Sequence, residues 1–264
     1  MEMVEDSVIT NKKKQPENRA DIVIAIKGLK KAFGKKVVLK DINLELKRGE
    51  NLVVLGRSGT GKSVAIQCIV GLLKPDGGSL KVFNSEVAEM PDRELKQLRI
   101  KTGFLFQSGA LYDSMTVREN LEFPLTRVLM LKDQKEIDKR VIDALDSVGL
   151  VESIDKLPSD LSGGMRKRAG LARTIIVNPE IILYDEPTTG LDPITSREIS
   201  NLILSIQKKY KTSSIIITHD MECARIAADR MLIMDDGVFI AEGSFDALHK
   251  SKNKTVEAFF NDIL

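Results

Sequence analysis

The chain has 264 residues, with 40 lysine and arginine residues against 38 aspartate and glutamate residues and a formal net charge of +2. This length suits one α/β domain, or one domain with an inserted subdomain, and such a chain buries about 70–75% of its unfolded surface. The near-neutral charge does not support wrapping nucleic acid, or lying on an acidic membrane by charge alone.

Cysteine usage and hydropathy restrict the class further. Cys68 and Cys223 are far apart and lie in predicted helices, so we expect two buried, reduced thiols rather than a disulfide or a metal site. Residues 1–20 are polar, lack the apolar core of a signal peptide and are expected to form a mobile leader. No run of 18 apolar residues occurs, so any membrane-spanning part must belong to another chain.

The first part of the chain predicts short strands and two helices. Apolar runs and alternation, bounded by turn residues, indicate strands at 21–27, 36–39, 42–46, 51–55, 79–83 and 102–106. Charged turns separate the second and third of these strands, and Phe33 falls on a loop between the first two. Helices are expected at 64–73, which has no proline before Pro75, and at 91–100.

The pattern becomes helical from 107 to 162. Thr116 and Glu119 resemble a capping box, and residues 132–148 carry apolar side chains three or four apart, as in an amphipathic helix. We interpret 108–162 as a helical subdomain inserted in one domain that covers 21–264.

Strands and helices alternate again beyond residue 175. We expect strands at 181–184 and 214–218 with a helix at 194–208 between them, which implies a mostly parallel sheet. Strands at 231–234 and 238–241 flank the hairpin turn Asp236-Gly237. The chain closes with a helix at 255–263, inside a C-terminal tail that covers about 252–264.

One stretch carries the clearest chemical signal. Residues 56–63 fit the phosphate-loop pattern, and a predicted strand precedes them while a helix beginning at Val64 follows; the residues are Gly56, Arg57, Ser58, Gly59, Thr60, Gly61, Lys62 and Ser63. The glycines let successive N–H groups face one anion, to which the helix N-terminus adds its positive dipole end. Lys62 is expected to reach the β- and γ-phosphates and Ser63 to ligate Mg²⁺. A glycine-rich turn is the alternative, which these flanks disfavour.

Two acids end a predicted strand. Asp185 and Glu186 follow the apolar run 181–184, and ligands of parallel sheets bind at that edge. We expect Asp185 to hold Mg²⁺ through water and Glu186 to polarise the attacking water. A helix cap is the alternative for this acid pair.

A second anion site is predicted at 162–164. Ser162, Gly163 and Gly164 open a helix that continues to about 176, and a helix N-terminus attracts anions. One nucleotide does not need two phosphate-binding sites, the loop at 56–63 and the helix start at Ser162, from the same chain. A head-to-tail dimer, with each ATP between the loop of one subunit and the Ser162 helix of the other, resolves this. An ordinary helix cap is the alternative.

Together these motifs resemble the ATP-binding subunit of an ABC transporter. Residues 56–63 match its Walker A, 181–186 its Walker B and 161–165 its signature, which usually ends in Gln rather than Met. Gln107 matches the Q-loop glutamine, 190–192 the D-loop, and His219 the switch histidine. Phe33 stands where the family places an aromatic that stacks on adenine; a core aromatic is the alternative. The motifs follow the family's order from about 22 to 245.

The resemblance implies an α/β cassette with a mostly parallel core sheet, an antiparallel β subdomain and the helical insertion, which binds ATP and Mg²⁺. Ser162, Gly163 and Gly164 would contact the γ-phosphate of the partner subunit's ATP, while His219 would position that phosphate and the water with Glu186. Gln107 would link Mg²⁺ to the surface that docks on the membrane subunit. Val64, directly after the phosphate loop, and Asp192, in the D-loop, complete the residues that the resemblance implies bind the nucleotide.

Within the family, LSGGMRKR at 161–168 and ALYDSMTVRENLEFPL at 110–125 resemble the ATPase of Mce-type phospholipid transporters. This resemblance implies a homodimer that drives phospholipid transport from the cytoplasmic face of the inner membrane. Its partners would be a permease, a periplasmic Mce lipid-binding protein and a small accessory subunit.

Other functions are kept as alternatives. An importer of peptides or amino acids is one, although oligopeptide importers typically carry a Cys-rich C-terminal extension that is absent here. A soluble ATPase acting on nucleic acid or ribosomes is disfavoured, because only a small insertion fits between Lys62 and Asp185. The presence of both Glu186 and His219 disfavours a cassette that binds ATP without turnover.

Overall fold

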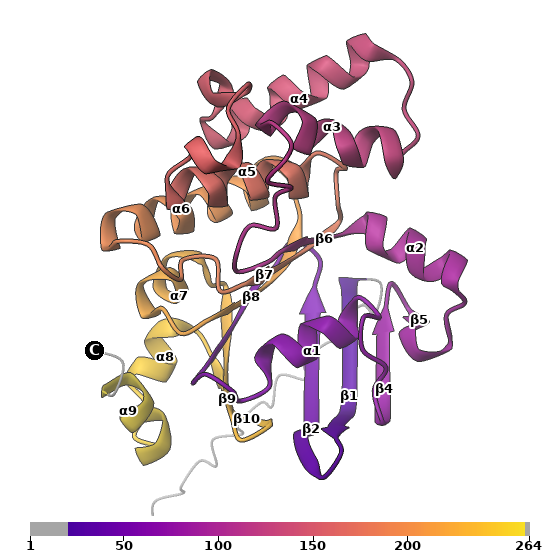
Figure 1. Cartoon of the computed structure of the whole chain (residues 1–264). Coiled ribbons are helices and arrows are strands. Elements are labelled where there is room, and N and C mark those ends of the chain that lie inside the picture. Colours follow the sequence, from indigo (N-terminus) through magenta and orange to yellow (C-terminus); the bar gives the residue numbers. More distant parts are fainter. Residues whose placement is uncertain (1–20, 262–264) are drawn as a thin grey trace, which may run out of the picture.

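The computed structural model describes residues 21–261, so the predicted leader at 1–20 and residues 262–264 lie outside the described range. The strands of this range form one mixed sheet with the order β5-β4-β1-β2-β10-β9-β3-β8-β7-β6 (Figure 1). They are β1 (Ile22–Phe33), β2 (Lys36–Lys47), β3 (Asn51–Gly56), β4 (Gly77–Val82), β5 (Ser85–Glu86), β6 (Thr102–Leu105), β7 (Ile181–Asp185), β8 (Ser213–Thr218), β9 (Arg230–Asp235) and β10 (Val238–Gly243). The α-helices are α1 (Lys62–Ile69), α2 (Asp92–Lys101), α3 (Val117–Arg127), α4 (Gln134–Val148), α5 (Gly163–Ile175), α6 (Pro193–Tyr210), α7 (Met221–Ala227), α8 (Phe245–His249) and α9 (Lys254–Asn261).

The core of the sheet is parallel. Strands β9, β3, β8, β7 and β6 pair in parallel, whereas β5, β4, β1 and β2 pair antiparallel. Every residue of β3 and β8 is buried, as expected for parallel strands covered on both faces. The predicted α/β cassette fold, with a parallel core and antiparallel strands, is confirmed.

The order of the parallel strands determines where the loops meet. Strand β8 lies between β3 and β7, and in this register Ile217 stands level with both Val54 and Asp185. The three strands therefore end at the same edge, which gathers the loops that follow Gly56, Asp185 and Thr218.

Helices α3, α4 and α5 pack together on the side of the sheet away from the antiparallel strands (Figure 1). The amphipathic pattern at 132–148 is confirmed in α4, whose buried stripe is Ile137, Val141, Ala144, Leu145 and Val148. The predicted capping box is present at α3, where Thr116 Oγ1 accepts from Glu119 N and the Glu119 carboxylate accepts from Thr116 N. These helices share one apolar cluster with α6 and α7.

Three predictions about local structure were wrong. Residues 36–39 and 42–46 belong to one strand, β2, since pairing with β1 continues across the charged residues through several register shifts. Phe33 is the last residue of β1 and lies in a strand, not in a loop. The helix after the phosphate loop begins at Lys62 and ends at Ile69, earlier at both ends than predicted.

The hairpin at Asp236-Gly237 is confirmed, and it joins the two parts of the sheet. Both residues have positive φ, 42° and 76°, as a tight hairpin turn requires. Lys40 N donates to Gly237 O at 3.0 Å, and a Cβ on Gly237 would lie 2.4 Å from Val38 O. Only glycine fits this close approach of β2 to the turn.

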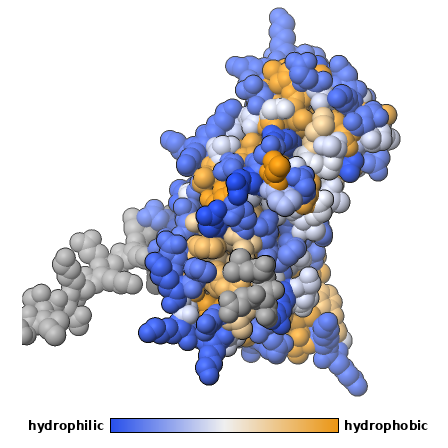
Figure 2. Space-filling view, turned by 90° about the vertical axis from the view of Figure 1, so that its left-hand side faces the viewer, coloured by the Kyte–Doolittle hydropathy of each residue, from blue (hydrophilic) through white to orange (hydrophobic). Residues whose placement is uncertain are grey.

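The surface shown in Figure 2 is mainly hydrophilic, with apolar side chains gathered at its top and along its middle. No helix in residues 21–261 combines the length and hydrophobicity that crossing a membrane requires. Cys68 and Cys223 are both buried and free, as predicted, and burial raises the pKa of the Cys68 thiol to about 11.

Leu145 tests the packing of the helical layer. Its side chain is 0% exposed, so we expect Leu145→Ala to lower the free energy of unfolding by about 2–5 kcal/mol, through lost burial and a residual cavity. Chemical denaturation measures the loss. Ile142→Ala, at a 40% exposed position of the same helix, is the control and should cost far less. Equal costs at the two positions would contradict the observed packing of α4.

Candidate nucleotide site

The phosphate loop has the backbone of an anion site. Gly59 and Gly61 have positive φ, 82° and 104°, and Gly61 is the N-cap of α1 without a side-chain capping bond. A Cβ on Gly61 would lie 2.9 Å from Leu39 Cδ2, so a larger residue would displace the loop from β2. The first N–H groups of α1 lack a side-chain cap and suit a negatively charged ligand.

Lys62 is a buried cation that folds back on this loop. Its side chain is 6% exposed, and Nζ donates to Gly56 O at 2.7 Å and to Arg57 O at 3.0 Å. Desolvation by burial lowers the pKa of Lys62, although the neighbouring Glu186 and Asp185 act in the opposite direction. A phosphate oxygen is a stronger acceptor for an ammonium group than a neutral carbonyl is. The side chain is thus placed to gain a better partner when a nucleotide binds.

Ser63 and Asp185 meet across the sheet edge. Ser63 Oγ donates to Asp185 Oδ1 at 2.9 Å, which joins the start of α1 to the end of β7. Burial raises the pKa of Asp185 more than the Ser63 hydrogen bond and the nearby lysines lower it. Within residues 21–261 no cluster of three or more His, Cys, Asp or Glu side chains could hold a metal. A hydroxyl beside one carboxylate suits Mg²⁺, which takes few protein ligands and completes its shell with phosphates and water.

Glu186 is held from several sides. Its backbone has φ 51°, an unusual left-handed conformation for a non-glycine residue. Its Oε2 lies 2.8 Å from His219 Nδ1 and accepts from Thr189 Oγ1 at 3.1 Å, while Oε1 lies 3.7 Å from Lys62 Nζ. The structure therefore brings together Lys62, Ser63, Asp185, Glu186 and His219, as the sequence motifs require.

Ser162 caps a helix in another part of the molecule. Its Oγ accepts from Met165 N at 3.2 Å, and α5 lies among the upper helices, apart from α1 (Figure 1). A Cβ on Gly164 would lie 2.5 Å from Thr195 Cγ2, so the start of α5 packs closely on α6. Asp192 caps α6 by accepting from Ile194 N and Thr195 N, both at 3.0 Å. Two helix N-termini thus lie side by side.

The remaining predicted residues, Gln107 and Phe33, lie at or just beyond the ends of strands. Gln107 follows β6 and is exposed, and its backbone oxygen accepts a short hydrogen bond from Lys167. Phe33 is 48% exposed, which excludes the alternative of a core aromatic. Lys31 Nζ lies 5.6 Å from the Phe33 ring centroid, so the ring already takes part in one cation–π contact.

Two residues of the site escaped the sequence motifs. Thr189 contacts the Glu186 carboxylate, and Lys167 donates to the backbone oxygens of both Gln107 and Glu186. A threonine in a loop and a lysine between two arginines carry no signal of burial or of long-range contact in the sequence.

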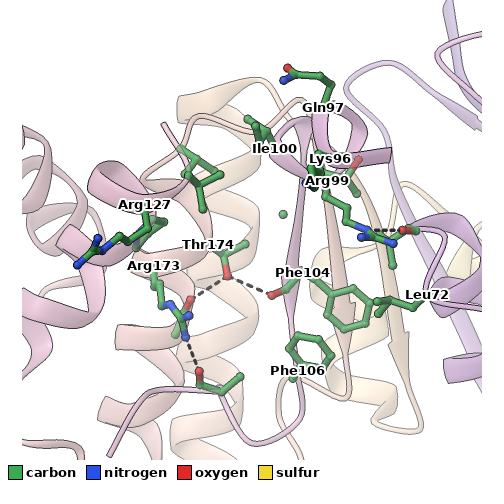
Figure 3. A pocket seen from close by; sticks show the side chains of 18 of the residues that line it. Leu72, Lys96, Gln97, Arg99, Ile100, Phe104, Phe106, Arg127, Arg173 and Thr174 are labelled. Carbon is green, nitrogen blue, oxygen red and sulfur yellow. Dashed lines mark hydrogen bonds between the residues drawn. The ribbon is translucent and has the colours of Figure 1, made fainter. Parts of the chain in front are cut away.

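A pocket of about 900 Å³ opens beside Gln107, between β6, α2, α3 and α5. In Figure 3, Phe104, Phe106 and Leu72 lie on one side, and Arg127, Arg173 and Thr174 on the other. The rings of Phe104 and Phe106 stack with centroids 4.1 Å apart. The pocket is mainly apolar and has a few charged groups at its rim.

The fold and this site define a phosphate-loop nucleotide-binding protein. The ABC transporter family matches residues 39–189, more than half of the chain. This chain belongs to that family, and it is an ATPase that binds ATP and Mg²⁺ and couples hydrolysis to transport.

Similar proteins come from several organisms. The probable ribonucleotide transport ATP-binding protein mkl of Mycobacterium leprae is 40% identical over 91% of this chain and 69% of its own length. The protein TRIGALACTOSYLDIACYLGLYCEROL 3 of Arabidopsis thaliana, chloroplastic, is 38% identical over 92% and 74%. The methionine import ATP-binding protein MetN of Campylobacter jejuni is 36% identical over 91% and 76%.

Solved structures share the fold. The ATP-binding cassette MJ0796, a dimer in a post-hydrolysis state bound to ADP and Pi, has a TM-score of 0.76 and 32% identity, covering 84% of this chain and 98% of that one. CbiO1 of Clostridium perfringens, part of the transporter complex cbiONQ, has a TM-score of 0.80 and 29% identity, covering 92% and 100%.

Asp185 predicts an effect of pH on stability. Because burial raises its pKa in the folded protein, the ionised form costs stability above that pKa, and the cost disappears below the pKa of the unfolded chain. We expect Asp185→Asn, free of nucleotide and Mg²⁺, to melt at a higher temperature than the unaltered protein at pH 7. The difference should shrink as the pH falls from the raised pKa of Asp185 to the usual aspartate pKa.

Thermal melts across this pH range measure the effect, with Asp113→Asn, at an exposed position, as the control. A lower melting temperature for Asp185→Asn at pH 7 would show that attraction to Lys62 and Lys167 outweighs the desolvation of Asp185.

Proposed function

We propose that two copies of this chain form a head-to-tail ATPase dimer that powers phospholipid transport through separate membrane subunits. The observation that carries the proposal is the separation of the phosphate loop from the N-terminus of α5 within one chain (Figure 1). Each is built for an anion, and a second copy lets both contact one nucleotide. The dimeric state of MJ0796 supports this arrangement.

In this proposal the residues at the sheet edge act on the triphosphate. The loop N–H groups from Gly56 to Val64 bind the phosphates, Lys62 neutralises their charge, and Ser63 and Asp185 hold Mg²⁺. Mg²⁺ supplies neutralisation of charge on the phosphate oxygens. Phe33 stacks on the adenine ring.

Glu186 has the position of the residue that orients water. Its carboxylate contacts His219 and Thr189 and lies at the edge where the phosphates bind, so it can accept a proton from water. His219 fixes the direction of that carboxylate and would position the γ-phosphate. Ser162, Gly163, Gly164 and Asp192 complete the site of the partner subunit.

The pocket beside Gln107 is the proposed docking site of the permease. It is apolar, and Phe106, Tyr112 and Met130 are 39%, 42% and 71% exposed on or near its walls. Exposed apolar side chains around a hollow are typical of a protein–protein contact. Gln107, which is proposed to sense Mg²⁺, begins the loop that forms one wall. The 108–162 insertion would move with this loop, and the chain would lie on the cytoplasmic face of the inner membrane through the permease.

The cargo is inferred from resemblance. The sequence patterns at 161–168 and 110–125, and the name of the plant relative, which is that of a glycolipid, favour lipid transport. The mycobacterial relative is named for ribonucleotide transport and the Campylobacter relative for methionine import. Import of a small polar molecule is therefore the second candidate. A periplasmic Mce protein and a small accessory subunit are the expected partners for phospholipid transport.

A mixing experiment tests the shared site. Lys62→Ala removes the cation from the loop, and Ser162→Arg blocks the start of α5, so neither variant alone should hydrolyse ATP at more than about a hundredth of the normal rate. A mixed dimer regains one intact site, and we expect about a quarter of normal turnover from random pairing, since half of the dimers each carry one working site. A mixture no more active than the single variants would place the whole site within one chain.

Reconstitution tests the cargo. The complex that co-purifies with this chain in mild detergent should contain an Mce protein and move fluorescent phospholipid between donor and acceptor vesicles only with ATP. Glu186→Gln provides the matched control, since it should retain assembly but not transport. ATP-driven uptake of methionine or a ribonucleotide without lipid transfer would contradict phospholipid transport and support the second candidate.

A further inference from the structure

Lys167 is a buried cation with an unusual pair of partners. It lies on the second turn of α5, is 6% exposed, and donates to the backbone oxygens of Gln107 and Glu186, the latter at 3.2 Å. Burial lowers its pKa, although Glu186 and Asp185 oppose this shift. Removing an ammonium group from water is expensive, and simple packing would be better served by an apolar side chain. The contacts of Lys167 therefore point to a role in positioning.

The first partner is the backbone of the proposed catalytic residue. Glu186 has the left-handed conformation, which is costly for a residue with a side chain. Three hydrogen bonds hold it there: Glu186 N donates to Ile217 O at 2.9 Å, and Glu186 O accepts from Thr189 N at 3.3 Å and from Lys167. Because this conformation directs the carboxylate toward His219, the hydrogen bond from Lys167 helps to fix the position of that carboxylate.

The second partner is the loop that follows β6, which α5 holds at further points. A Cβ on Gly170 would lie 2.8 Å from Gly109 O, so the loop backbone rests directly on the helix. Arg173 donates to Ala110 O and lies over the Tyr112 ring. Lys167, Gly170 and Arg173 are three residues apart and form one stripe along α5. Only Lys167 in this stripe also reaches Glu186.

We propose that Lys167 is a positioning residue for hydrolysis, which fixes the backbone of Glu186 and ties it to the Gln107 loop and to α5. The proposal rests on the proposed role of Glu186 in orienting water. Lys167 acts through backbone carbonyls and touches no reacting atom, so its loss affects turnover rather than nucleotide binding.

The test uses Lys167→Met, which keeps most of the unbranched side chain and removes the donor. We expect kcat for ATP to fall about tenfold or more while KM changes less than about twofold. The control is Arg168→Met on the same helix, since Arg168 donates to Val148 O and Glu198 and contacts neither loop. Its kcat should change less than about twofold. A similar fall in kcat for both variants would reduce Lys167 to a structural role and overturn the proposal.

Hydrogen exchange provides a readout besides activity. In nucleotide-free Lys167→Met, amides of 107–112 and 186–191 should exchange about tenfold faster or more, while those of β3 and β8 keep their protection. Faster exchange throughout the chain, or none in these loops, would overturn the proposal. Should Lys167→Met fail to fold, Lys167→Leu, which is apolar and also lacks a donor, is measured with the same expectations.

A double-mutant cycle separates the two proposals. Glu186→Gln alone should lower turnover by ~10²-fold, and adding Lys167→Met should then lower it by less than about twofold, because both changes act on one carboxylate. Near-normal turnover in Glu186→Gln would overturn the role of Glu186. If Glu186→Gln turns over slowly and adding Lys167→Met lowers turnover again by as much as it does in the unaltered protein, only the positioning role would be overturned.

Discussion

The site depends on one constraint, which is that β3, β8 and β7 are parallel neighbours and end at the same edge. The hydrogen bond from Ser63 to Asp185, at 2.9 Å, spans that edge and joins segments 122 positions apart in sequence. Since β8 lies between the other two strands, His219 follows directly beside both loops. A shift of one residue in either pairing would turn alternate side chains to the opposite face and separate Glu186 from Lys62.

Buried lysines offset the negative charge of the acids at this edge of the sheet. Two lysines, Lys62 and Lys167, are each 6% exposed, and they face Asp185 and Glu186 across the ends of the strands. Their ammonium groups donate mainly to backbone carbonyls of the loops, so the same cations that offset the acids also shape the backbone. Burial lowers the pKa of both lysines, because desolvation outweighs attraction to the acids. An anion in the phosphate loop would relieve that penalty for Lys62, whereas Lys167 donates to the backbone oxygens of Gln107 and Glu186.

The parallel core and the assembly of its acids were predictable, because buried parallel strands are near-continuous apolar runs that end in polar residues. The antiparallel part was not, since four register shifts in the pairing of β1 with β2 interrupt the alternation that identifies a strand. Lys167 was hidden for another reason. Arg166, Lys167 and Arg168 form one polar run, and only the geometry of α5 turns the middle residue inward. Long-range packing decides which charge is buried, and it leaves no local pattern.

The position of Lys167 has a consequence for how two copies would work together. The N-terminus of α5 offers Ser162 to the partner's nucleotide in the proposed dimer, and Lys167 lies five residues further along, about 7.5 Å up the helix axis. A helix of this length moves as a rigid body, so a shift of α5 on binding the partner's phosphates reaches Lys167 undiminished. Lys167 then transmits the shift to Glu186 of its own site and, with Gly170 and Arg173, to the loop at the pocket beside Gln107. Closure of the dimer around one nucleotide would thereby shift α5. Through Lys167, that shift would position Glu186 in the other site and the loop of the docking pocket.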